Sequence, residues 1–132
     1  MTKEQLRRYG ALKRERAQLE EKIEEIEAAL YSPKAQRMTG MPSTPSHGNA
    51  TEALIARHLE LQELYRAKLA ELAEEQLMIE AAIESLGLTA RTLLRYRYID
   101  CLKWEEICLR MSYSWRQTHN LHSKALEALR DK

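Results

Sequence analysis

The chain has 132 residues, of which 44% are hydrophobic and 31% charged, and its formal net charge is +1. This length suits one domain, or one small module with a long extension, and the net charge alone neither favours nor excludes nucleic acid. The first ten residues are too charged for a signal peptide, and no apolar run reaches membrane-spanning length. We therefore expect an intracellular protein with no membrane partner.

Residues 3–31 predict one long helix. Its apolar side chains alternate at spacings of three and four, as in a coiled-coil seam, and are Tyr9, Leu12, Leu19, Ile23, Ile26 and Leu30. Arg16 falls at one position of this seam. Pro33 disfavours helical geometry in the residue before it, so we expect the helix to end near residues 31–32.

The segment 32–50 follows neither a helical nor a strand period. It contains all three prolines of the chain, two of its four glycines and several small polar residues. Such a composition predicts a flexible linker, and its length would let the chain reverse between two helices.

Residues 51–87 predict a second long helix, with Thr51 as a candidate cap at its start and Gly87 as a left-handed residue at its end. Gln76 occupies one position of its apolar stripe, which contains Leu61, Tyr65, Leu69, Leu72, Ile79, Ile83 and Leu86. Two such stripes must be covered. They can pair with each other as an antiparallel hairpin, or with a second chain in a homodimer, and the sequence leaves both arrangements open.

The segment 88–132 divides into three short amphipathic pieces, which is the layout of a helix-turn-helix. Thr89 is a candidate cap for the first piece, Trp104–Met111 forms the second, and Ser114 caps the third after a bend at Ser112 and Tyr113. The buried face of the last helix is predicted to contain Leu121, Ala125 and Leu126, with Thr118 facing the bend.

The exposed side of the last helix carries the candidate DNA-binding residues. Five side chains are predicted to point outward from its N-terminal half, namely Trp115, Arg116, Gln117, His119 and Asn120. Arg can bridge two acceptors of guanine, and Gln or Asn can pair with adenine. His122, Lys124 and Arg130 lie further along and are expected to meet phosphates. The basic residues of segment 89–132 number nine against five acidic ones, which suits a phosphate-binding surface.

The remaining reactive side chains indicate neither an enzyme nor a metal centre. Cys101 and Cys108 lie seven residues apart, without a zinc-binding spacing, and we interpret them as structural thiols. His119, His122 and the scattered glutamates form no set of nucleophile, base and orienting group. We therefore expect no catalytic residue, no metal and no cofactor.

The stretch LLRYRYIDCLKWEEICLRMSYSWRQTHNLHSKALEAL resembles the C-terminal DNA-reading domain of sigma factors. It is still more similar to phage-encoded transcriptional regulators of the RinA/ArpU type, which share that domain. The resemblance extends over the whole chain, although its N-terminal part is loose. It implies an all-α fold with a long helical hairpin or coiled coil followed by a sigma-like helix-turn-helix. It also implies activation of phage late genes in the cytoplasm of a bacterial host, by binding double-stranded promoter DNA together with host RNA polymerase.

The chain departs from the sigma-like pattern at five positions. Gly is usual where this chain has Cys101 and Ser112, Ala where it has Cys108, and a capping Ser or Thr where it has Lys103. Cys and Ser are expected to be small enough to keep the helix crossing close. Lys103 cannot cap as a hydroxyl does, so it leaves a frayed helix start or places its ammonium on a phosphate. Trp115 replaces a common polar residue and either touches a thymine methyl or covers the bend.

Two other functions compete with this interpretation. A phage small terminase subunit also combines a helix-turn-helix with coiled-coil helices, but it assembles into rings and recognises DNA for packaging. A pure interaction protein would instead use the long helices to hold a partner. The mass of the assembly separates the first alternative from a regulator, because a regulator is expected as a monomer or dimer.

Overall fold

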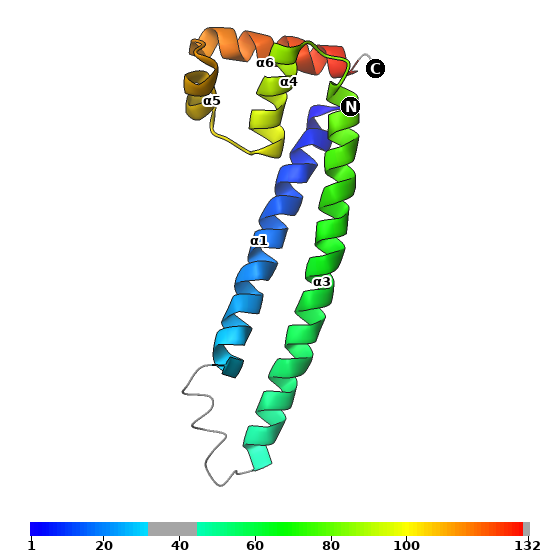
Figure 1. Ribbon diagram of the computed structural model, residues 1–132, viewed down its shortest axis with the longest axis vertical. Helices are drawn as coiled ribbons and strands as arrows, with labels where there is room; N and C mark the ends of the chain where they lie inside the picture. Colours follow the sequence, from blue (N-terminus) through cyan, green and yellow to red (C-terminus); the bar gives the residue numbers. More distant parts are fainter. Residues whose placement is uncertain (32–44, 131–132) are drawn as a thin grey trace. The chain divides into compact units, whose positions relative to one another are not determined.

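The computed structural model describes residues 1–31 and 45–130, and every regular element within these ranges is a helix (Figure 1). The elements in chain order are α1 (Lys3–Tyr31), α3 (Pro45–Ile83), α4 (Leu88–Leu94), the π-helical turn η1 (Arg95–Ile99), α5 (Trp104–Met111) and α6 (Trp115–Arg130). The predicted all-α fold, with two long helices before a module of short helices, is confirmed.

Several helix ends differ from the sequence-based expectation. The first helix ends at Tyr31 as Pro33 predicts, whereas α3 begins at Pro45, so the last residues assigned to the linker are helical. Residues 32–44 of the predicted linker lie outside the described ranges. Gly87 is extended, with φ −61°, and precedes α4 as its cap. The left-handed helix end predicted at Gly87 is wrong because α3 already ends at Ile83. The cap predicted at Thr89 is wrong because α4 begins at Leu88, so Thr89 lies within the helix.

The chain divides into two compact units, Met1–Lys13 with Glu71–Lys132, and Arg14–Ala70. In the second unit, α1 and α3 pair antiparallel within one chain, as the hairpin alternative predicted. Lys68 Nζ lies 2.7 Å from Glu15 Oε2, and His58 Nε2 lies 3.1 Å from Glu27 Oε1. Leu61 is fully buried here, whereas Leu69, predicted in the same stripe, is 40% exposed.

The first unit has one core to which the start of α1, the end of α3 and the C-terminal helices all contribute. Its buried side chains include Leu6, Tyr9, Leu12, Leu72, Ile79, Ile83, Leu94, Tyr98, Ile99, Ala125 and Leu129. An ion pair between Arg95 and Glu80, with Nη2 and Oε2 2.7 Å apart, joins η1 to α3. The helix-turn-helix therefore does not have a core of its own, because the ends of the two long helices complete it.

In the described ranges, two residues other than glycine adopt the left-handed backbone conformation, Cys101 (φ 57°) and Ser112 (φ 56°). Ser112 closes α5: its N–H donates to Leu109 O at 3.3 Å, and the N–H of Tyr113 donates to Cys108 O at 3.1 Å. These two hydrogen bonds form a Schellman motif, which favours Gly at its left-handed position. Gly would suit positions 101 and 112 because the backbone there is left-handed. From the sequence alone, the expected reason is a close crossing of two helices.

Cys101→Gly and Ser112→Gly should each stabilise the fold by about 0.5–1 kcal/mol. Gly removes the Cβ clash of the left-handed conformation, and its greater freedom in the unfolded chain offsets part of that effect. Urea unfolding of each variant beside the wild type measures the change. Ser112→Val is the matched control and should destabilise, because a β-branched side chain tolerates positive φ poorly. Equal stability for Gly and Val at this position would contradict the account.

Candidate nucleic-acid interface

The helix α6 begins with a capping box formed by Ser114 and Gln117. The N–H of Gln117 donates to Ser114 Oγ at 3.1 Å, and the N–H of Ser114 donates to Gln117 Oε1 at 2.9 Å. The two bonds satisfy donors that a helix start otherwise leaves unpaired. Ser114 is thus the cap that the sequence predicted. Gln117, named as a base-reading residue, has its side-chain oxygen occupied by the cap.

The helix α5 braces α6 through a small buried contact. Thr118 is fully buried, and its hydroxyl donates to Ser114 O at 2.9 Å. The Cys108 thiol, from α5, reaches that hydroxyl at 3.3 Å, and Ile107 beside it is fully buried. Thr118 therefore faces the bend as predicted, and the start of α6 is held on one side by its own cap and on the other by α5.

The capping residues Ser114 and Gln117 are exposed, and so are five further predicted DNA-binding residues. They are Trp115, Arg116, Asn120 and Lys124 on α6 and Lys103 before α5. Trp115 is 55% exposed, and no ion pair involves Arg116 or Lys124 within the described residues. Arg116 and Asn120 are four residues apart and so share one face of the helix. This face presents guanidinium and amide groups without a partner from the described part of the chain.

His119 is not directed outward as expected. Its ring packs between two tryptophans, with centroid distances of 4.5 Å to Trp104 and 4.4 Å to Trp115. Its Nε2 atom is buried without a hydrogen-bond partner in the described structure. The Arg97 guanidinium also lies over the Trp104 ring in a cation–π contact, 4.6 Å from the ring centroid. The outward prediction for His119 is wrong because an aromatic side chain at this position is stabilised by packing against both neighbours.

His122, expected to meet phosphates, is buried and only 6% exposed. Its Nε2 lies 2.6 Å from the Tyr98 hydroxyl, and the Trp104 ring approaches edge-on at a centroid distance of 4.7 Å. Burial, together with the cations of Lys3, Arg97 and other nearby groups, lowers the pKa of His122 to about 4. The ring is therefore neutral at physiological pH, and the Tyr98 hydroxyl can donate to it.

The buried face of α6 contains two polar residues, which is why the sequence placed it incorrectly. Thr118, His122, Ala125 and Leu129 are buried, whereas the predicted Leu121 and Leu126 are half-buried. The spacing of four, three and four fits a helical stripe. Only Ala125 and Leu129 of these four are apolar. A prediction from hydrophobic residues alone therefore places the buried face nearer to Leu121 than the structure does. Arg97 and Trp104, which the sequence analysis did not single out, also belong to this layer of rings.

The start of α5 has no side-chain cap. Lys103 is extended and makes no capping hydrogen bond, while Glu105 and Glu106 in the first turn favour the positive end of the helix dipole. Arg110 pairs with Glu106 at 3.1 Å, so its charge is partly neutralised. Lys103, by contrast, is exposed with its ammonium available for an anion.

The described residues contain no cluster of three His, Cys, Asp or Glu side chains that could hold a metal ion. Cys101 and Cys108 are both free thiols. Among the helices of these same ranges, none is long and apolar enough to cross a membrane. Comparison of the chain with protein-family models, curated proteins and solved structures finds no match.

Lowering the pH from 6.5 to 4 should destabilise the fold through His122. The unfolded chain takes up a proton near pH 6.5, whereas the folded chain takes it up only near pH 4, so stability is complete above pH 6.5 and falls below it. The decrease reaches about 3 kcal/mol over this range. Urea unfolding at several pH values measures it. His122→Gln keeps a partner for Tyr98 but cannot titrate, and it should be destabilised less on acidification; parallel decreases in both proteins would contradict the assignment.

Proposed function

We propose that this chain is a sequence-specific DNA-binding transcriptional regulator, a phage or prophage late-gene activator that acts with host RNA polymerase and has no catalytic role. The observation that carries the proposal is the N-terminal half of α6. That half is capped by Ser114, braced by α5 and exposes Arg116 and Asn120 on one face. This is the part of a recognition helix that contacts base edges in helix-turn-helix proteins.

The exposed side chains have complementary chemistry for the major groove. The Arg116 guanidinium can donate two hydrogen bonds to O6 and N7 of guanine, and the Asn120 amide can pair with N6 and N7 of adenine. Gln117 would need both atoms of its amide for an adenine, but Oε1 is held by the Ser114 N–H. We therefore assign base reading to Arg116 and Asn120, and to Gln117 only the hydrogen bonds that its NH₂ group can donate. To Trp115, whose ring is exposed, we assign an apolar contact with a thymine methyl.

Phosphate contacts are assigned to Lys103 and Lys124, which are both exposed. We propose the contact with RNA polymerase because of the sequence resemblance, and an exposed surface on α5 suits such a contact. Leu109 is 80% exposed beside the exposed Glu105, four residues earlier on the same helix face. An apolar side chain next to a carboxylate suits a partner protein with a basic rim.

Arg116→Ala should weaken binding to the specific site by about 1–3 kcal/mol and leave binding to random DNA nearly unchanged. Lys124→Ala should weaken both alike and reduce the salt dependence, since it removes a phosphate contact. Titration of the full chain against a selected site and a scrambled duplex measures both effects. Arg8→Ala is the control, because Arg8 pairs with Glu75 and lies outside the proposed DNA-contacting residues, and it should leave binding to both duplexes nearly unchanged. An equal weakening on both duplexes for Arg116→Ala would refute base reading by α6.

Exposed apolar side chains on α3 support self-association through the long helices. Within the unit Arg14–Ala70, Ile55 and Leu59 are about half exposed and lie four residues apart. A homodimer would bury them and would match a two-fold symmetric DNA site. The alternative function, a small terminase subunit that recognises DNA for packaging, requires a larger ring.

Light scattering coupled to gel filtration should give the mass of a dimer for the full chain. Ile55→Glu should convert it to a monomer, because the substitution places a charge at the proposed contact while leaving the fully buried Leu61 untouched. Glu60→Gln, on an exposed position nearby, is the control and should leave the dimer intact. A ring-sized mass would favour the terminase alternative.

A further inference from the structure

The first turns of α1 are fixed to the same unit as the recognition helix. The N-terminal ammonium of Met1 donates to Leu129 O at 3.1 Å, near the end of α6. Leu6 is fully buried and Tyr9 nearly so, in a core that also contains Leu129 and Tyr98. Charged side chains on these turns of α1 therefore have defined positions beside α4, η1 and α6.

The basic side chains of these turns fall into two groups. Arg8 pairs with Glu75 at 3.4 Å, and Lys13 donates to Ile99 O at 2.8 Å, so both serve the fold. Lys3 and Arg7 are exposed, and no hydrogen bond or ion pair holds either of them in the part of the chain that the structure describes. They are four residues apart on one helix face, where like charges repel each other and destabilise the helix.

Arg97, in η1, adds a third positive charge to those of Lys3 and Arg7 and lies within the C-terminal helices. Its guanidinium lies over Trp104 and donates to Leu102 O at 2.9 Å, and no carboxylate pairs with it among the described residues. Lys3, Arg7 and Arg97 all lie near enough to the buried His122 for their charges to lower its pKa. We call Lys3, Arg7 and Arg97 the N-terminal cationic patch.

We propose that the N-terminal cationic patch binds backbone phosphates of the DNA duplex, beside the bases that α6 contacts. The inference rests on the proposed DNA-binding function and adds α1 to the interface. Unpaired like charges held close together are costly unless an anion covers them, and a duplex contacting α6 brings a row of phosphates past the same unit. Ring and backbone contacts hold the Arg97 guanidinium in place, and the buried Leu6 and Tyr9 fix the turns of α1 that carry Lys3 and Arg7.

The test is the salt dependence of DNA binding by the full chain. Lys3→Ala with Arg7→Ala should weaken binding to specific and random duplexes alike, by roughly five- to tenfold at 0.1 M salt for each phosphate that is no longer neutralised. The slope of log affinity against log salt should become shallower by about 1 for each such phosphate. Arg8→Ala is the matched control, because it removes the same charge from the neighbouring position and should leave the slope unchanged.

The remaining variants separate the outcomes. Lys3→Arg with Arg7→Lys keeps both charges and should retain the wild-type slope, and a melting curve checks that the double alanine variant is folded. An unchanged slope in the double alanine variant overturns the cationic patch while leaving base reading by Arg116 in place. An equal change in Arg8→Ala also overturns it, because net charge alone would then explain the effect. A wild-type chain that binds no DNA overturns both this inference and the proposed function.

Discussion

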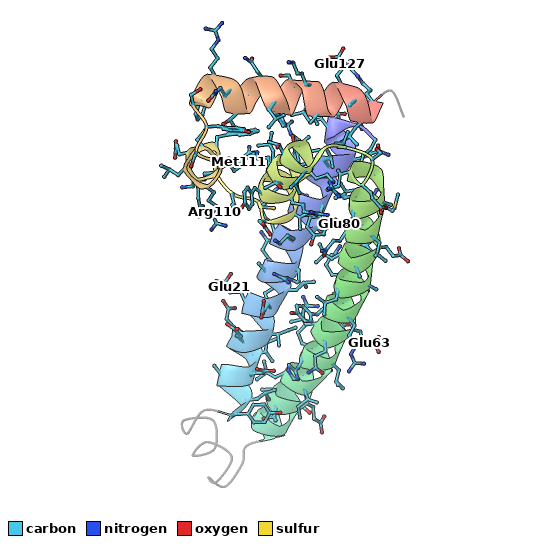
Figure 2. The ribbon with its side chains drawn as sticks, turned by 45° about the horizontal axis from the view of Figure 1, so that its top comes forward. Glu21, Glu63, Glu80, Arg110, Met111 and Glu127 are labelled. Atoms are coloured by element: carbon cyan, nitrogen blue, oxygen red, sulfur yellow. The ribbon has the colours of Figure 1, made fainter. Side chains whose placement is uncertain are left out.

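The arrangement of the C-terminal helices depends on the burial of one face of α6. That face joins Thr118 and His122 to Ala125 and Leu129, and it packs on residues from α1, α3 and η1 as well as on the neighbouring short helices. A sixteen-residue helix has little stability from its own hydrogen bonds in water. Its exposed face keeps a fixed orientation because the opposite face is held by segments from distant parts of the sequence (Figure 2).

The polar residues in this contact make it more specific than an apolar one would be. A hydroxyl and an imidazole must each find a partner when buried, and Ser114 and Tyr98 supply them at 2.9 Å and 2.6 Å. A shift of α6 along its axis would separate His122 from Tyr98, and the unpaired buried ring would cost about 1–3 kcal/mol. The Thr118 bond to Ser114 lies within the capped end of α6 and would move with the helix. The contact between the Trp104 ring of α5 and the His119 ring of α6 depends on the same register, whereas Trp115 contacts His119 within α6 itself.

Local rules of the sequence predicted much of this fold. Helical periodicity indicated two long helices and three short ones, and Ser114 with Gln117 three residues later is the signature of the capping box that the structure contains. The sequence did not indicate that His119 and His122 turn inward, because their partners Trp104 and Tyr98 come from other elements. The place of Lys3 and Arg7 beside the helix-turn-helix also depends on contacts across more than a hundred residues, which no local period reveals.

The capping box has a consequence for how this surface can diverge in sequence. A side chain that serves only recognition can be exchanged freely whenever a different binding partner is favoured. Gln117 is not such a side chain, because its oxygen also holds the start of α6. Exchange at this position carries a folding penalty of about 1 kcal/mol unless Glu replaces it. Relatives with altered preference should therefore vary first at Arg116 and Asn120, while positions 114 and 117 drift together as a pair.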